Sequence, residues 1–418
     1  MNRVIFLIAF IILLCVPFSI NTGNEESFRY LEIVKKLKDE IISVVIKTET
    51  TTSSKLAFSE EDKLLFNKKY EEFKIAEALN LEYLIASYDE ESVANNKNIN
   101  KYLAKFKWLS LKEKEGGVKG IYLNGYDFTN KNKIQSITTI LLETEVNTIV
   151  LDVKTDNGHL LYNSGLPEAN ELNNKRVKYD QDELLKFKSK FNIYLIGRVV
   201  AFQDPIFAKN FKDSSVIDSE TNLPFNHNGQ YFLDPSDDKA RDYILNVAIE
   251  ACSLGFDEIQ FDYIRYPDTN TKGLIYEDEN IIENRVENIN SFLTSSKDIL
   301  NGMGCLVSAD IFGYVLQNQS DNGIGQHLET IAETVDFLSP MVYPSHYSKG
   351  SFGYHYPNDF PYEVVSSALQ DGLIRGIEEE KIRPFLQGFW HSSKEVQLNI
   401  KAAENKNLDW IIWNNSSQ

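Results

Sequence analysis

The chain has 418 residues, of which 42% are hydrophobic and 25% are charged, and its formal net charge is −18. This composition is that of a globular protein with apolar residues for one large domain or two, and it excludes a chain that is disordered throughout. The acidic excess argues against nucleic acid or an anionic membrane as partner, because Lys and Arg hold such partners by neutralising phosphates. A neutral or cationic ligand fits the charge better, although solubility alone would also explain it.

The first 23 residues have the order of a secretory signal. Arg3 precedes an apolar run, residues 4–20, and polar residues follow the run. The run is slightly shorter than the roughly 20 apolar residues that span a bilayer, and no small-x-small cleavage site follows it. Residues 1–23 are therefore expected to be a signal peptide or a membrane anchor. Either alternative predicts an extracytoplasmic protein, secreted or tethered to the membrane by this segment.

Residues 24–117 differ in pattern from the rest of the chain. Residues 27–47 and 59–88 carry apolar side chains at spacings of three and four among Lys and Glu, which indicates amphipathic helices. The polar stretch 48–55 between them is typical of a linker. No catalytic constellation is present here, so we expect a small helical extension that ends at Gly117.

The remaining residues, 118–418, alternate between two patterns. Short apolar, β-branched runs typical of strands occur at 120–126, 147–154, 193–202, 256–264, 304–313, 335–343, 382–389 and 408–414. Helical patterns occur between them at 133–145, 181–191, 239–255, 281–300, 324–334, 362–373 and 394–407. Eight strands alternating with helices predict an α/β fold, a (β/α)8 TIM barrel, which typically takes about 250 residues or more. An open doubly wound sheet is the alternative, and the absence of a Gly-rich dinucleotide turn after the first strand makes it less favoured.

The fourth predicted strand carries a row of polar residues. Glu258, Gln260 and Asp262 occupy every second position of FDEIQFDYIRYP, whereas Ile259, Phe261 and Tyr263 alternate with them. Side chains alternate across a strand, so the polar row is expected to face the barrel interior. Chemistry in such barrels takes place at the carboxyl ends of the strands. This rule selects Asp262 as a catalytic candidate, and Glu258 as a residue that stabilises the lower barrel.

Other predicted strands end in polar or aromatic residues that would meet Asp262 at the same rim. They are Asp152, Lys154, Arg198, Asp310, Tyr343, His346, Gln387, Trp390 and Trp413. Burying many ionisable groups without ligands would cost several kcal/mol for each unpaired charge. An ion pair between Asp152 and Arg198 that merely closes the barrel is a structural alternative, and a loop His such as His346 is often only a hydrogen-bonded surface residue. For Asp262 and Asp310, on adjacent strands, a functional role is favoured.

Two carboxyls that share a cavity with Tyr and Trp indicate cleavage of a glycosidic bond. One carboxyl protonates the departing oxygen, and the other attacks the anomeric carbon or activates water. We expect Asp262 to be the nucleophile or base and Asp310 the general acid, with Asp152 as the reserve carboxylate. Lys154, Arg198, Gln260, Tyr343, His346 and Gln387 would contact sugar hydroxyls or tune the acids, and Trp390 and Trp413 would stack on the sugar.

Seven blocks of the sequence resemble a family of bacterial proteins that carry a glycoside hydrolase domain of uncharacterised activity. They are GIYLNGY, VLDVKTDNG, GRVVAFQDP, LGFDEIQFDYIRYP, VSADIFG, SPMVYPSHY and FLQGFW, in this order between residues 120 and 414. The resemblance implies a barrel that acts on carbohydrate, with no known substrate. The polar positions that match are Asp152, Lys154, Arg198, Asp262, Arg265, Asp310, Tyr343 and His346.

Two wider resemblances bear on the catalytic roles. Asp262 has the place of the nucleophile that ends the fourth strand in α-amylase-type barrels, and Asp310 has the place of their acid. The stretch 256–267 is also similar to the fourth strand of chitinase-type barrels, DGxDxDWEYP, yet Ile264 stands where their acid Glu would be. Isoleucine cannot donate a proton, so chitinase chemistry is not expected.

Other features leave alternatives open. A noncatalytic carbohydrate-binding or cell-envelope scaffold barrel is the main alternative function, whereas a phosphate-sugar isomerase lacks its Gly-rich phosphate loops here. The insertion 226–238 is expected to lie over the cavity. Cys252 and Cys305 are expected to be buried, inert thiols, although a disulfide is open. No cofactor and no metal is expected, because neither cysteine has another Cys or His at ligand spacing.

Overall fold

The computed structural model describes residues 108, 111–112, 116–269 and 271–414. All of them belong to one unit of the chain, Lys107–Gln418. The expected leader, residues 1–23, and nearly all of the expected helical extension, residues 24–117, lie outside the described residues, and both stay predictions. Within the described ranges, no helix is long and apolar enough to cross a membrane.

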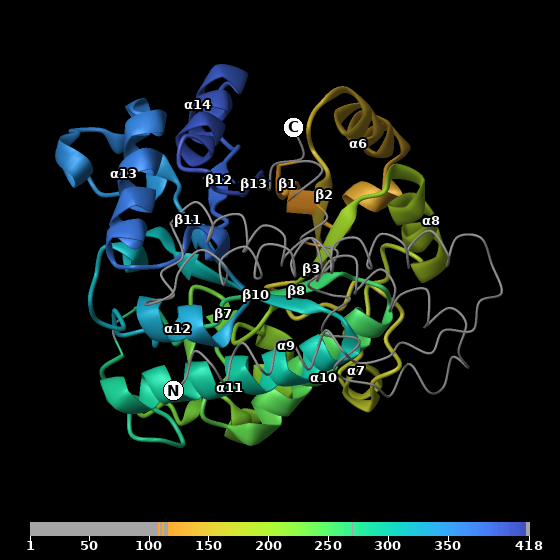
Figure 1. Cartoon of the computed structure of the whole chain (residues 1–418). Helices are drawn as coiled ribbons and strands as arrows, with labels where there is room; N and C mark the ends of the chain where they lie inside the picture. The colour runs from red at the N-terminus through yellow and green to blue at the C-terminus, as the bar shows by residue number, and fades with distance from the viewer. Residues whose placement is uncertain (1–107, 109–110, 113–115, 270, 415–418) are drawn as a thin grey trace, which may run out of the picture. The chain divides into compact units, whose positions relative to one another are not determined.

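Eight parallel strands close into a barrel (Figure 1). In chain order they are β1 (Lys119–Leu123), β2 (Thr148–Lys154), β3 (Tyr194–Val200), β8 (Glu258–Asp262), β10 (Leu306–Phe312), β11 (Phe337–Met341), β12 (Phe385–Gln387) and β13 (Trp410–Trp413). Each barrel strand pairs with the next barrel strand along the chain, and the last strand, β13, pairs with the first, β1. This arrangement confirms the predicted (β/α)8 barrel.

Helices follow the first seven barrel strands. They are α6 (Lys131–Glu143), α8 (Gln181–Phe191), α10 (Asp238–Ser253), α11 (Ile282–Met303), α12 (Leu328–Thr334), α13 (Pro361–Ile374) and α14 (Ser393–Glu404). Local signals fix where several of them begin: Asn130 and Asp180 accept backbone N–H groups at the starts of α6 and α8, and Ser392 forms a capping box with Glu395 at α14. The two longest, α10 and α11, pack side by side (Figure 1).

Shorter helices and strands lie within the loops that follow the carboxyl ends of the barrel strands. They are α7 (Pro167–Glu171), α9 (Pro205–Asn210), β4 (Ile217–Asp218), β5 (Leu223–Pro224), β6 (Asn226–His227), β7 (Gln230–Tyr231) and β9 (Leu274–Ile275). The insertion 226–238 therefore begins with the small hairpin of β6 and β7.

Alternation along the strands divides an apolar outer layer from a polar interior. Ile259 and Phe261 face the helices, where Phe261 packs edge-on against Phe292 of α11 with ring centroids 5.2 Å apart. Glu258 and Gln260 point inward and are fully buried. Burial of the outer layer supplies the hydrophobic stabilisation, so each inward polar group needs a partner inside the barrel.

In the lower barrel, Glu258 has such a partner in Arg383, with which it forms an ion pair. Nη2 of Arg383 lies 2.9 Å from each carboxylate oxygen of Glu258, and the hydroxyls of Ser308 and Tyr194 also donate to this carboxylate. Burial raises the pKa of Glu258, and the charge of Arg383 opposes that rise. The guanidinium lies 4.1 Å from the ring centroid of Phe337. Glu258 thus has the structural role that its position predicts.

Cys252 and Cys305 form a disulfide, so the preference for two inert thiols is wrong. Cys252 lies near the end of α10 and Cys305 directly before β10, with their Cα atoms 6.0 Å apart. The helix after the third strand passes the start of the fifth strand closely enough for the bond, and sequence spacing alone does not reveal that contact.

We predict that Arg383→Met lowers the free energy of unfolding by about 3–5 kcal/mol, because Glu258 would remain buried without its counterion. Urea denaturation of the two proteins measures the difference. Lys112→Ala is the matched control, since the Lys112–Glu380 pair is exposed to solvent and an exposed pair contributes only about 0–1 kcal/mol. Equal losses in the two variants would contradict a structural role for the buried pair.

Candidate functional site

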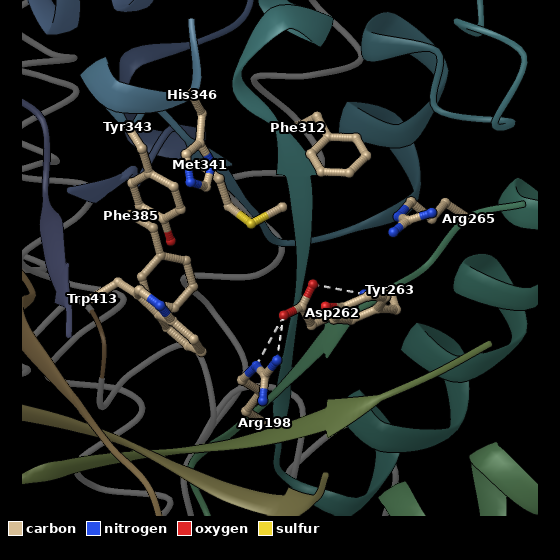
Figure 2. Close-up of a pocket in the computed structure, with 10 residues that line it drawn as sticks. All are labelled: Arg198, Asp262, Tyr263, Arg265, Phe312, Met341, Tyr343, His346, Phe385 and Trp413. Carbon is tan, nitrogen blue, oxygen red and sulfur yellow. Dashed lines mark hydrogen bonds and ion pairs between the residues drawn. The ribbon is translucent and has the colours of Figure 1, made fainter. Parts of the chain in front are cut away.

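A cavity of about 190 Å³ opens at the carboxyl ends of the barrel strands. Asp262, Phe312, Met341 and Trp413 each end a strand and line it. The complete lining is Arg198, Asp262, Tyr263, Arg265, Phe312, Met341, Tyr343, His346, Phe385 and Trp413 (Figure 2). The cavity therefore lies where barrel enzymes place their chemistry.

Arg198 holds two carboxylates at the floor of this cavity. Its Nε and Nη2 donate to Oδ2 of Asp262 at 3.0 and 2.6 Å, and its Nη1 donates to Oδ1 of Asp152 at 2.7 Å. Burial disfavours the guanidinium charge, but the charges of Asp262 and Asp152 outweigh that penalty and raise the pKa of Arg198 well above its usual value. The predicted Asp152–Arg198 ion pair is present, and it extends to Asp262.

Asp152 lies beneath the cavity wall rather than in it. Its Oδ2 accepts a hydrogen bond from the Tyr122 hydroxyl at 2.7 Å, and its backbone carbonyl accepts one from Tyr179. Burial raises its pKa, while Arg198 and the Tyr122 hydroxyl act in the opposite direction. The carboxylate is thus enclosed by protein partners, which fits a residue that orients Arg198.

Asp310 has a different environment. It is fully buried on β10, and neither of its carboxyl oxygens has a hydrogen-bond partner among the described residues. Burial, followed by the negative charge of Asp262, raises its pKa well above the usual range, and Arg198 offsets this only in part. The environment of Asp310 therefore favours its neutral, protonated form.

The strand register brings Asp310 and Asp262 to the same level. Ala309 of β10 pairs with Phe261 of β8, so the next residue on each strand is a carboxylic acid. Neighbouring strands lie about 4.8 Å apart, so the two backbones carry their acids side by side. Two carboxyls in different environments are an arrangement that general acid–base chemistry uses.

Aromatic rings form the opposite wall of the cavity. Tyr343, Phe385 and Trp413 follow one another along one side and face Asp262 across the space (Figure 2). Trp413 is fixed between Tyr122, stacked at 3.8 Å, and the guanidinium of Arg198, 4.9 Å from its ring centroid. His346 is half-buried beside Tyr343, and burial lowers its pKa. Flat apolar surfaces of this kind suit the C–H faces of a sugar.

Four of the predicted substrate-binding residues do not line the cavity. Lys154 is fully buried, donates to the carbonyl of Val200 and pairs with Asp204 at 2.9 Å. The cause is a register shift between Asp152 and Lys154, which removes Lys154 from the inward row.

Of the other three residues, Gln260 and Gln387 form hydrogen bonds within the protein, and Trp390 is exposed to solvent. Gln260 donates to the Ser339 hydroxyl inside the barrel, and Gln387 accepts from the backbone N–H of Ser345. Trp390 is 80% exposed. The insertion 226–238 contributes none of the cavity lining described here.

Two lining residues, Tyr263 and Arg265, contradict the alternation that the sequence indicates. Tyr263 has a positive φ of 51°, so the chain turns immediately after Asp262 instead of continuing the strand. The expectation that Tyr263 points away from the cavity was therefore wrong. Arg265 pairs with Asp268 at 2.9 Å and also lines the cavity.

Sequence reasoning also missed the apolar lining residues. Phe312, Met341 and Phe385 line the cavity from strand ends that carried no polar signal. Within the described ranges, no group of three or more His, Cys, Asp or Glu side chains could hold a metal ion.

The comparisons with known proteins agree with the barrel fold. Residues 120–418 match the family described as "Putative glycosyl hydrolase domain". The match covers most of the chain, so this protein belongs to that family. No curated protein matched the sequence.

Solved structures include two useful comparisons. A hypothetical protein from Ruminiclostridium thermocellum is 33% identical, with 46% of this chain and 96% of that chain covered and a TM-score of 0.41. The PgaB (BpsB) glycoside hydrolase domain from Bordetella bronchiseptica is 12% identical, with 71% and 94% covered and a TM-score of 0.54. At that identity the second likeness shows a shared barrel fold.

We predict that Arg198→Met makes stability depend strongly on pH. Without the guanidinium, Asp152 and Asp262 would be buried together with no counterion, which costs about 3–5 kcal/mol at neutral pH. Both acids would then take up protons more readily folded than unfolded. The variant would be most stable below the unfolded Asp pKa of about 3.9 and would lose stability as the pH rises. Urea denaturation between pH 3.5 and 8 measures this, and a loss independent of pH would contradict the pairing.

Proposed function

We propose that the barrel hydrolyses a glycosidic bond, with Asp262 as nucleophile or base and Asp310 as general acid. The observation that carries the proposal is that Asp310 and Asp262 lie at the same level of neighbouring strands, where Arg198 pairs with Asp262 and burial raises the pKa of Asp310. Membership of the glycosyl hydrolase-like family supports the reaction class. The catalytic roles and the substrate are part of the proposal.

Asp262 is oriented for attack on a bound sugar. Arg198 occupies its Oδ2, and the backbone N–H of Tyr263 donates to its Oδ1 at 2.7 Å. Both contacts favour the charged form of a carboxylate, because each donates to it. Because Tyr263 has a positive φ, its N–H points toward the side chain of the preceding residue, Asp262. A nucleophile or base must also face the cavity, and Asp262 lines it.

Asp310 is suited to donate the proton. Its buried site keeps the carboxyl neutral, as an acid catalyst requires, and the charge of Asp262 strengthens that effect. Retaining glycosidases place their two carboxyls about 5–5.5 Å apart. Adjacent strands about 4.8 Å apart favour this class over the wider inverting spacing.

The remaining cavity residues would hold a carbohydrate. Tyr343 and Trp413 contribute aromatic rings to the lining, and His346 contributes an imidazole whose pKa is lowered by burial. Arg265 also lies in the lining, and its Nη1 donates to the carbonyl of Tyr266 and to the carboxylate of Asp268. In this proposal Asp152 does not touch the sugar and instead positions Arg198.

We also propose that the enzyme works outside the cytoplasm. The Cys252–Cys305 disulfide supports this location, since such bonds persist mainly in oxidising compartments. The basic, apolar and polar order of residues 1–23 is the independent reason. Cell-envelope and extracellular polysaccharides would then be the accessible substrates.

A noncatalytic carbohydrate-binding barrel is the second candidate. One observation favours it: of the three predicted carboxyls, all within the described residues, only Asp262 lines the cavity. A binding protein needs no acid that reaches the substrate, whereas the hydrolase requires Asp310 to reach the glycosidic oxygen. Turnover of any glycan by the purified protein separates the two candidates.

We predict that Asp262→Asn abolishes hydrolysis while glycan binding persists, because the amide can neither attack nor accept a proton. Screening the parent protein against bacterial envelope and exopolysaccharide glycans, with reducing ends as readout, identifies the substrate. Asn is nearly isosteric and still accepts from Arg198, so folding should be kept. An Asp262→Asn protein as fast as the parent would show that the roles are wrong.

For Asp310→Asn we predict a loss that depends on the leaving group. Natural glycosides need their oxygen protonated, so kcat/KM should fall by about 10²–10⁴. A dinitrophenyl glycoside of the same sugar departs without a proton, so its cleavage should fall much less. The parent should also lose activity as the pH rises through the raised pKa of Asp310, since only the protonated form donates. Equal losses on both substrates would contradict the general-acid role.

A further inference from the structure

The five-residue loop between β12 and α14, residues 388–392, exposes a tryptophan to solvent. Trp390 is 80% accessible, the highest value among the exposed large hydrophobic residues described. We propose that Trp390 is the outer platform of a carbohydrate-binding strip that continues from the cavity, so that the ligand is a glycan chain rather than a single sugar. This inference deepens the proposed function and rests on it.

A series of ring contacts connects the cavity to Trp390. Tyr343, in the cavity wall, meets Phe389 edge-on with centroids 5.3 Å apart. Phe389 in turn meets Trp390 at 5.2 Å and an interplanar angle of 82°. His346, also in the wall, lies 5.7 Å from Phe389. A sugar chain whose end occupies the cavity would therefore meet further ring surfaces as it leaves.

The backbone of Trp390 has a conformation that is strained for a bulky residue. Its φ is 56°, in the left-handed region where a bulky side chain is an outlier. The loop is fixed at both ends: the N–H of Gly388 donates to the carbonyl of Trp413, and α14 begins after its cap, Ser392. A Cβ added to Gly388 would lie 2.7 Å from a methyl carbon of Ile412. The short connection forces the turn, and glycine would be the least costly residue at position 390.

A buried polar network holds the loop in this conformation. Nε2 of Gln387 donates to the carbonyl of Phe389 and to Asn358, and His391 contacts the same Asn358 oxygen at 3.1 Å. The fully buried Asn399 donates to the carbonyl of Gln387 and meets the other ring nitrogen of His391. Strain maintained by surrounding contacts is characteristic of functional sites. Here the contacts fix the backbone, while the indole itself remains in solvent.

The occupant that fits best is the remainder of the glycan held in the cavity. Continuity of the rings from Tyr343 to Trp390 gives a strip, and aromatic faces bind the C–H surfaces of sugars without requiring charge. The net charge of −18 favours a neutral or cationic chain over an anionic one.

The test measures binding in the Asp262→Asn protein, which holds glycans without cleaving them. The probes are chitosan oligosaccharides, which are cationic, and dextran oligosaccharides, which are neutral, each from dimer to octamer. We expect affinity for one series to rise with length in calorimetry. Trp390→Ala added to this protein should weaken octamer binding by about tenfold, or roughly 1.4 kcal/mol, and leave dimer binding unchanged.

Trp390→Gly separates binding from folding. Glycine adopts a positive φ without strain, so the melting temperature should stay equal to the parent's or rise, while octamer binding falls as it does in the alanine variant. A lower melting temperature in the glycine variant would make Trp390 a packing residue and overturn the proposal.

Other results would also overturn it. Affinity that is independent of length, or no binding of either series, would show that the strip holds no glycan chain. A parent that self-associates in sedimentation, with Trp390→Ala monomeric, would make the indole a protein contact. The catalytic roles fail separately: length-dependent binding together with full activity of Asp262→Asn would leave the strip standing and remove Asp262 from the reaction.

Discussion

The double ion pair of Arg198 is the interaction on which the barrel top depends. One guanidinium from β3 pairs with Asp152 on β2 and with Asp262 on β8, and all three side chains are nearly excluded from solvent. Two carboxylates could not both stay ionised in such a place without a shared cation, since desolvation penalises each charge. Arg198 pairs with Asp152 and Asp262 and not with Asp310 on the next strand. The pKa of Asp310 is therefore raised, which favours its neutral form. The distribution of charge at the rim thus follows from which acids the guanidinium reaches.

The barrel interior contains a second ion pair with a different consequence. Glu258 and Arg383 lie lower in the barrel, fully buried and away from the cavity lining, and Ser308 and Tyr194 add hydrogen bonds. That pair can only stabilise. At the rim, Asp262 borders a cavity, so its charge is available to a ligand. The same strand, β8, therefore carries a structural carboxylate at its start and one that borders the cavity at its end, which is the division that barrel geometry predicts.

Much of this arrangement could be predicted from the sequence, because alternation along regular strands places Asp262, Arg198 and Trp413 at one rim. The predictions were wrong where the backbone departs from regularity. The register shift in β2 turns Lys154 toward Asp204, and the left-handed residue Tyr263 brings itself and Arg265 into the lining. Long-range contacts were also inaccessible: only the packing of α10 against the start of β10 makes Cys252 and Cys305 a pair. Apolar lining residues carry no signal that separates them from the core.

The proposed mechanism gives the neighbouring acids a reason to be coupled. Asp310 keeps its proton partly because Asp262 is charged. When Asp262 bonds to the anomeric carbon, or takes a proton from water, its negative charge is lost and no longer adds to the rise in the pKa of Asp310, whereas burial still raises that pKa and Arg198 still lowers it. The proton of Asp310 then becomes easier to release at the step when the departing oxygen needs it. Return of charge to Asp262 would favour reprotonation of Asp310. In the proposed reaction, the charge on Asp262 thus helps to set when Asp310 releases its proton, and no further titratable residue is needed between the two acids.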